Sequence, residues 1–105
     1  MVLFKKQFID KIRRGEKTQT RRIWTKSRVK IGNVYPCQTS YFSEPFARIK
    51  VTGLWQERLG HISGRDVKAE GFNALAEFID AWKVINGSYD PNTMVYVVQF
   101  EVVYP

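Results

Sequence analysis

A chain of 105 residues that is 44% apolar has the length of one domain and enough apolar surface for a core, which excludes wholesale disorder. One cysteine, Cys37, and one histidine, His61, exclude an internal disulfide and a zinc site built from Cys and His. The net charge is +7, no apolar run reaches the roughly 20 residues that span a bilayer, and residues 1–8 lack the pattern of a secretory signal, so we expect a cytoplasmic protein without a membrane span.

The first third of the chain contains one helical pattern followed by two short strand patterns. Apolar residues recur with a helical period over residues 4–14, and Gly15 supplies a stop signal. Residues 18–23 alternate and have β-propensity. A basic, polar stretch over residues 24–32 then leads through a turn to a short strand over residues 34–38.

The remaining elements are a strand, two helices and a final strand. Residues 46–55 alternate between apolar and polar, as in a half-buried strand. A capping pattern starts a short helix over residues 63–70, and Asn73 is placed to cap an amphipathic helix over residues 73–86. A β run over residues 94–104 follows. This order predicts an α+β domain on a mostly antiparallel sheet or barrel and lacks the regular alternation of a doubly wound fold.

Positive charge is concentrated in the first third of the chain. Residues 1–35 hold eleven Lys and Arg against two acids, a net of +9, whereas residues 36–105 hold six against eight, a net of −2. Such asymmetry favours a polyanionic partner, because neutralising phosphates releases counterions; the alternative is a solvated basic surface. The candidate nucleic-acid contacts are Arg21, Arg22, Trp24, Lys26, Arg28 and Lys30.

Aromatic residues near the basic segment have two readings. Rings beside cations suit stacking on bases, but a domain of this size must also bury its large side chains. We expect Tyr35, Tyr41, Phe42 and Phe46 to lie mostly in the core, and Trp24, in its polar stretch, to be accessible.

The segment over residues 15–22 carries a candidate for chemistry. A threonine hydroxyl such as that of Thr20 becomes a nucleophile only if a base takes its proton. Lys17 can be that base if burial lowers its pKa. Glu70 is a candidate to position the proton, but spacing alone does not bring it to Lys17. The alternative is that Thr20 is an ordinary strand residue and that Lys17 is a solvated lysine near a turn.

These residues resemble a known family. Gly15, Lys17 and Arg22 match the Gly-x-Lys-x-x-x-x-Arg motif of the ASCH domain, and the segment over residues 69–72, Ala-Glu-Gly-Phe, is similar to a second feature of such domains. The resemblance covers nearly the whole chain. It implies a single, stand-alone ASCH domain over residues 1–105, with a PUA-like, mostly antiparallel β-barrel and flanking helices.

The resemblance implies a divided set of functions. PUA-like domains suggest binding of RNA or a modified nucleoside in a cleft lined by the motif. One branch of the family consists of amidohydrolases that deacetylate acetylated cytidine with a lysine, a threonine and a glutamate, which fall here on Lys17, Thr20 and Glu70. Other members resemble nucleases or transcription-associated factors. We therefore expect an RNA or nucleoside binder, with the amidohydrolase as the alternative and a catalytically inactive, protein-binding domain as a third reading; neither metal nor cofactor is implied.

Overall fold

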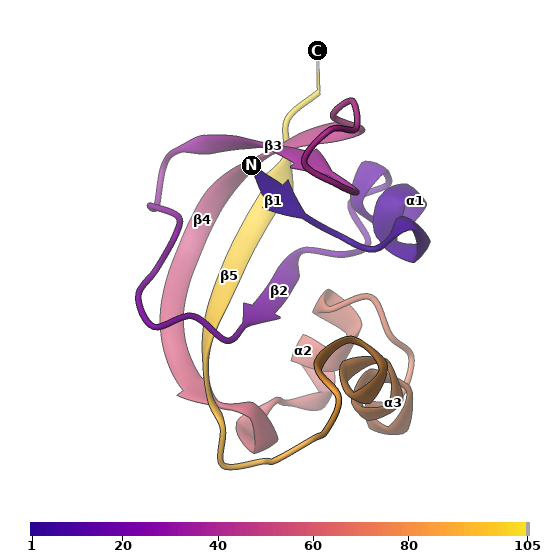
Figure 1. Ribbon diagram of the computed structural model, residues 1–105, viewed down its shortest axis with the longest axis vertical. Coiled ribbons are helices and arrows are strands. Elements are labelled where there is room, and N and C mark those ends of the chain that lie inside the picture. The colour runs from indigo at the N-terminus through magenta and orange to yellow at the C-terminus, as the bar shows by residue number, and fades with distance from the viewer. Residues whose placement is uncertain (105) are drawn as a thin grey trace.

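The computed structural model describes residues 1–104 and contains one curled, five-stranded sheet with three α-helices (Figure 1). The strand order is β1-β3-β4-β5-β2; β1 pairs with β3 in parallel, and every other pair is antiparallel. The predicted α+β class with a mostly antiparallel sheet is therefore confirmed. The strands are β1 (Val2–Leu3), β2 (Gln19–Arg22), β3 (Val34–Gln38), β4 (Ala47–Arg58) and β5 (Met94–Val102).

A long ribbon of β4 and β5 gives the sheet its curvature. The two strands pair from Ile49 opposite Val102 to Arg58 opposite Met94, with a register shift between Val51 and Gly53. Such an irregularity bends a strand and increases its twist. The alternation predicted for residues 46–55 is confirmed by burial over residues 48–52, since Ile49 and Val51 are buried and the alternating residues Arg48, Lys50 and Thr52 are exposed.

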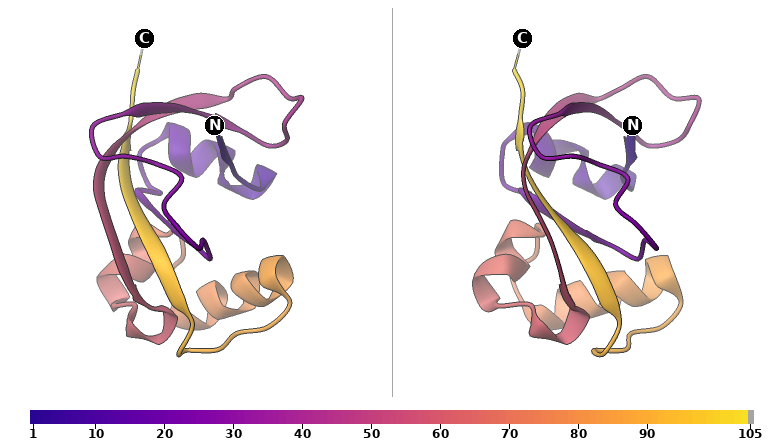
Figure 2. Two further views of the ribbon diagram at one scale, coloured as in Figure 1. Left: turned by 60° about the vertical axis from the view of Figure 1, so that its left-hand side comes forward. Right: turned by 90° about the vertical axis from the view of Figure 1, so that its left-hand side faces the viewer.

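The helices lie at the two ends of this ribbon. Figure 1 shows α1 near β1 and β3, with α2 and α3 at the opposite end and β2 crossing the space between them. Figure 2 shows α1 and α3 on the concave side of the curved sheet. The helical elements are η1 (Lys6–Phe8), α1 (Ile9–Arg13), η2 (Leu59–His61), α2 (Gly64–Ala69) and α3 (Leu75–Asn86).

The core divides into two apolar clusters. One surrounds Phe4, Ile12 and Ile49, and the other surrounds Leu59 and Trp82 under α2 and α3. Phe72 packs against both clusters. Cys37, in the first cluster, is fully buried, and this burial raises the pKa of its thiol to about 12. The space between the two clusters is where the candidate site lies.

The N-terminal segment differs from the helix expected over residues 4–14. Val2 and Leu3 instead pair with Cys37 and Gln38, a 3-10 turn follows, and α1 begins only at Ile9. The pairing with a distant strand overrides the local helical period. The apolar stripe was nevertheless a correct indicator of burial, because Phe4, Phe8 and Ile12 are all in the core.

Two further expectations are corrected. Asn73 does not cap α3: its backbone N–H donates to the Glu77 carboxylate at 3.0 Å, and Ala74 is the N-cap residue. Tyr41 and Phe42 do not join the core, because the β3–β4 loop carries them outward, 67% and 101% exposed. Ser63 behaves as predicted and accepts a hydrogen bond from the Asp66 N–H at 3.1 Å.

Candidate functional site

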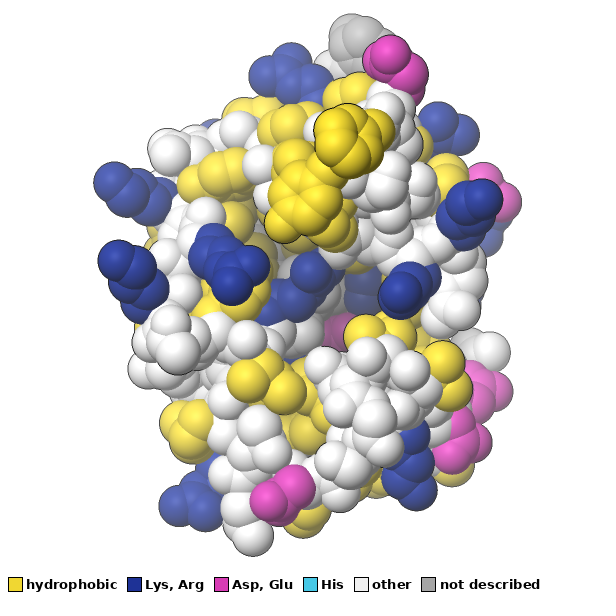
Figure 3. Space-filling model, in the orientation of Figure 1, with side chains coloured by type: hydrophobic (Ala, Val, Ile, Leu, Met, Phe, Trp, Pro, Cys, Tyr) yellow, Lys and Arg dark blue, Asp and Glu magenta, His cyan; other side chains and the backbone are white. Residues whose placement is uncertain are grey.

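A cleft of about 410 Å³ opens between the two core clusters. Figure 3 shows it as a hollow near the centre of one face, with Lys or Arg side chains and an acidic side chain visible inside. Its walls are aromatic, from Phe8, Phe72, Phe78 and Trp82, and its remaining lining includes the two arginines and the threonine hydroxyl of β2. The volume falls within the roughly 300–1,000 Å³ of small-molecule sites.

Two glycines bring Lys17 and Glu70 to the same place. Gly15, with φ of +74°, ends α1 and turns the chain, and Gly71, with φ of +101°, ends α2 directly after Glu70. Both conformations are readily accessible to glycine. The backbone N–H of Thr18 donates to the carbonyl of Ala69 at 2.8 Å and ties the two turns together. The proximity that sequence spacing could not establish therefore comes from the backbone.

Lys17 and Glu70 form a buried ion pair at the floor of the cleft. Lys17 Nζ lies 3.1 Å from Glu70 Oε1 and 2.7 Å from the Glu70 carbonyl oxygen, and the two side chains are 2% and 6% exposed. Burial lowers the pKa of Lys17 below its ordinary 10.5, and the charge and hydrogen bond of Glu70 oppose that shift. The Phe8 ring, 4.4 Å from Nζ, also favours the charged form.

Thr20 and Arg22 share one side of β2. Arg22 Nε donates to the Thr20 hydroxyl oxygen at 3.0 Å, and Arg22 Nη2 donates to the carbonyl of Leu3 at 2.7 Å. Among residues 1–104, Arg22 forms no ion pair with a carboxylate. A half-buried guanidinium of this kind is suited to an anion or a polarised carbonyl oxygen.

Arg21 departs from the role expected for a phosphate contact. Its side chain is 0% exposed and lies 3.0 Å from Glu70 Oε2, 3.3 Å from Asp66 Oδ2 and 3.5 Å from Glu57 Oε1. Strand alternation turns it away from Arg22 and toward Gln19, to which it donates, and Arg21 still contributes to the lining of the cleft. The Arg21 guanidinium is therefore paired with three carboxylates. It contacts Oε2 of Glu70, whereas Lys17 contacts Oε1.

The remaining predicted contacts lie at or beyond the mouth of the cleft. Trp24 and Arg28 line it, with the Arg28 guanidinium carbon 5.9 Å from the Trp24 ring centre. Trp24 is half-buried against Tyr96 and is therefore less accessible than expected. Lys26 and Lys30 are exposed and do not line the cleft.

Sequence reasoning missed part of the lining. Phe78 and Trp82 were identified only as an amphipathic stripe, and no local signal connects Lys5 to the cleft. Phe72 follows the Glu70-Gly71 pair, so its position in the second motif was the one available clue.

A second, shallower groove of about 700 Å³ lies elsewhere, lined by residues that include Thr52, Trp55, Arg65 and Asp66. Among residues 1–104, no three His, Cys, Asp or Glu side chains are grouped to hold a metal ion. Within the same residues, no helix has the length and apolar composition needed to cross a membrane.

Comparison with known proteins identifies the fold. The family model of the ASCH domain matches residues 1–104. The chain is similar to an ASCH domain structure from Lactobacillus crispatus JV V101, with 18% identity and a TM-score of 0.76 over 92% of this chain and 70% of that one.

Two further solved structures are similar to this chain. Protein EF3133 from Enterococcus faecalis V583 has 20% identity and a TM-score of 0.70 over 92% of this chain and 67% of that one. The hypothetical protein PH0355 has 14% identity and a TM-score of 0.72 over 97% and 96%. Identities this low show a common fold, which is the expected PUA-like one. No curated protein matches the sequence at a significant level.

Proposed function

We propose, on the premise that this chain belongs to the ASCH domain family, that its cleft binds a nucleoside, either free or as an unpaired nucleotide of RNA. In this proposal residues 1–105 act as one domain. The observation that carries it is the combination of aromatic walls with a polar floor in one cleft. Flat apolar surfaces stack on a base, and buried donors and acceptors recognise its edge.

The cations around the cleft have separate roles in this proposal. Arg22 and Arg28, which line the cleft, contact a phosphate or a carbonyl oxygen of the ligand. Lys26 and Lys30, exposed in the adjoining segment, contribute to the attraction of a polyanion. Arg21 is instead a positioning residue, because its ion pairs with carboxylates direct Glu70 toward Lys17.

The tryptophans of the chain provide a direct test of binding. Trp24 and Trp82 line the cleft, whereas Trp55 lines the second groove. In a Trp55→Phe variant, all remaining indole fluorescence comes from the cleft. We expect acetylated cytidine to change this fluorescence and to saturate. The matched Trp24→Phe variant should show a smaller response. A flat titration together with no retention in equilibrium dialysis would remove the proposal.

A second function is favoured by the position of Lys17 and Thr20 on the same cleft. In this alternative the chain is an amidohydrolase acting on the acetyl group of acetylated cytidine. The buried lysine, whose pKa is lowered by burial, is the base, and the Thr20 oxygen, which accepts a hydrogen bond from Arg22, is the nucleophile.

The steps balance as an acyl transfer followed by hydrolysis. Lys17 takes the hydroxyl proton as the Thr20 oxygen bonds to the acetyl carbon, and that proton passes to the amine of cytidine as the C–N bond breaks. Water then attacks the acyl-threonine with Lys17 as base, releasing acetate and restoring the hydroxyl. Glu70 holds the lysine throughout. Chromatography of acetylated cytidine incubated with wild type and with Lys17→Ala tests this alternative. We expect cytidine to be released only by the wild type. If neither protein releases cytidine, the amidohydrolase is excluded and the binding function remains.

A further inference from the structure

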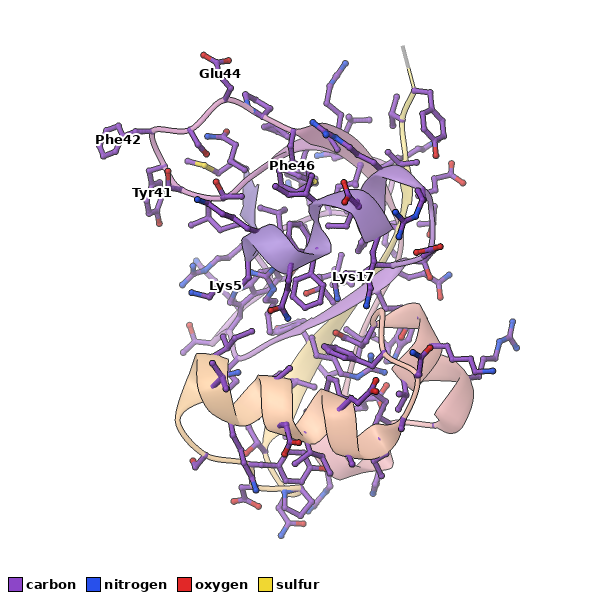
Figure 4. All side chains as sticks on the ribbon, turned by 90° about the vertical axis from the view of Figure 1, so that its right-hand side faces the viewer. Lys5, Lys17, Tyr41, Phe42, Glu44 and Phe46 are labelled. Atoms are coloured by element: carbon purple, nitrogen blue, oxygen red, sulfur yellow. The ribbon has the colours of Figure 1, made fainter. Side chains whose placement is uncertain are left out.

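The most exposed aromatic side chains of the chain lie together at the tip of the β3–β4 loop. Phe42 is 101% exposed and the neighbouring Tyr41 is 67% exposed. Figure 4 shows both rings pointing away from the body of the protein. We call this pair the aromatic tip. A side chain in full contact with water contributes little to folding, so the packing of the domain does not explain these rings.

The loop that carries the aromatic tip is held in one shape by polar side chains. The Gln38 amide donates to the carbonyl oxygens of Ser40, Tyr41 and Ser43, at 3.2, 3.4 and 2.7 Å. The Ser43 hydroxyl oxygen accepts from the backbone N–H groups of Thr39 and Ser40, at 3.2 and 3.0 Å. Rings presented by such a fixed loop lose little entropy when a ligand stacks on them.

The aromatic tip is close to the mouth of the cleft. Thr39 lines the cleft, and three residues of extended chain span at most about 11 Å, so the backbone of Phe42 lies within that distance of Thr39. A ligand longer than one nucleotide that fills the cleft can therefore reach the tip. For comparison, a small β-barrel domain of the OB fold typically binds roughly 4–16 nucleotides of a single strand.

The charges beside the aromatic tip favour a polyanion. Lys5 and Arg28 both line the cleft and are exposed, and Lys6 is exposed next to Lys5. In Figure 4, Lys5 lies on the same side as Tyr41 and Phe42, whereas Glu44, the acidic residue of the loop, points away from it. Aromatic rings next to cations match the stacked bases and phosphates of a single strand.

We propose that Tyr41 and Phe42 are a stacking platform for bases of single-stranded RNA, on the nucleotides that adjoin the one bound in the cleft. This inference rests on the proposed function of the cleft and specifies its ligand as a strand of RNA. A free nucleoside is then only a fragment of that ligand. The cleft then holds one nucleotide, and the aromatic tip holds the chain that leads to it.

The test compares a strand with a nucleoside on the same variants. The probes are a fluorescein-labelled, eight-nucleotide RNA with one central acetylated cytidine, and free acetylated cytidine. For the Tyr41→Ser/Phe42→Ser double variant we expect affinity for the RNA to fall about tenfold or more, because the bases lose both rings on which they stack. Affinity for the nucleoside stays unchanged. Val84→Ser, at an 86% exposed apolar residue outside the cleft lining, is the matched control and leaves both affinities unchanged.

Several results overturn the platform, and they differ from failure of the cleft. Unchanged RNA affinity in the double variant, or wild-type RNA affinity no greater than that for the nucleoside, removes the platform and leaves the cleft as a nucleoside site. Wild type that binds neither probe removes both proposals. If the double variant loses self-association in sedimentation while its RNA affinity is unchanged, the aromatic tip is a contact between copies of this chain. Recovery of RNA affinity in Tyr41→Phe/Phe42→Tyr, which restores both rings, supports stacking.

Discussion

Lys17 donates to two oxygens of one residue, the backbone carbonyl of Glu70 at 2.7 Å and its carboxylate Oε1 at 3.1 Å. A neutral amine keeps two N–H groups, so Lys17 can lose its third proton without losing either hydrogen bond. The carbonyl contact depends on the backbone at the end of α2 and not on the charge of Glu70. Lys17 is therefore held in place in both protonation states, as a base that cycles a proton requires.

This relationship predicts a pH dependence with a definite sign. If neutral Lys17 is the base, kcat/KM for acetylated cytidine rises with pH up to the pKa of Lys17, which burial lowers below 10.5. Glu70 raises that pKa, so in Glu70→Gln the rising limb moves to lower pH. pH–rate profiles of both proteins check this. A limb that stays in place or moves to higher pH in Glu70→Gln contradicts the assignment of Lys17.

The same shift affects folding stability. Between the lowered pKa of folded Lys17 and its ordinary 10.5, the unfolded chain binds the proton that the folded chain has lost. The free energy of unfolding attributable to Lys17 therefore rises with pH across that interval. Urea unfolding at a series of pH values should show a shallower dependence in Lys17→Met than in the wild type.

Lys11 provides a control for Lys17 within the same fold. Both ammonium groups donate to backbone carbonyls at the end of α2, Lys11 to that of Gly71, but only Lys17 lines the cleft. We expect Lys17→Met to remain folded, because Glu70 keeps its ion pair with Arg21. If the chain is the amidohydrolase of the alternative proposal, this variant loses roughly 10²–10⁴-fold in deacetylation rate. Lys11→Met should retain the rate. Equal losses in both variants would show that the effect comes from the turn and not from the base.

Substitution of Thr20 separates binding from chemistry. Thr20→Val keeps the branched side chain in β2 and removes the hydroxyl that accepts from Arg22. We expect nucleoside affinity within a few fold of wild type. For the amidohydrolase alternative, we also expect no deacetylation by Thr20→Val and partial recovery of the rate in Thr20→Ser. Mass spectrometry of the wild type under single-turnover conditions should show an acetylated Thr20. Turnover by Thr20→Val would remove threonine as the nucleophile.

Substitutions of Arg21 and Arg28 should have opposite effects on stability and on RNA binding, although both arginines lie in the basic first third of the chain. Arg21→Met leaves Glu57 and Asp66 without this buried cation and Glu70 with Lys17 as its remaining cation, and it should cost roughly 3–5 kcal/mol of stability in urea unfolding. Arg28→Met should leave stability nearly unchanged and lower the salt dependence of RNA binding by about one unit of log–log slope. A stable Arg21→Met with weakened RNA binding would return Arg21 to the phosphate contacts.

Local signals in the sequence predicted the fold where local contacts decide it. The strand at Val34–Gln38, the cap at Ser63 and the end of α3 at Asn86 were all as expected. The start of the chain was not, because β1 forms only by pairing with β3, some 35 residues away.

In the candidate site, too, the sequence predicted what is local and not what depends on contacts between distant elements. The resemblance to the ASCH family grouped Lys17, Thr20 and Arg22, which lie within a span of six residues. It could not indicate that Arg21 would be buried by Glu57, Asp66 and Glu70, which come from other elements. Nor does composition distinguish a buried ring from an exposed one, and a loop held by Gln38 and Ser43 carries Phe42 into solvent.

Nucleoside binding in the cleft is tested most directly by titrating ¹⁵N-labelled protein with acetylated cytidine and following its amides by two-dimensional NMR. We expect saturable shifts at the amides of Thr20, Arg22 and Phe72 around the cleft, and little change at Thr52 and Arg65 in the second groove. Shifts confined to the second groove, or none at all at millimolar nucleoside, would contradict the assignment of the cleft as the ligand site.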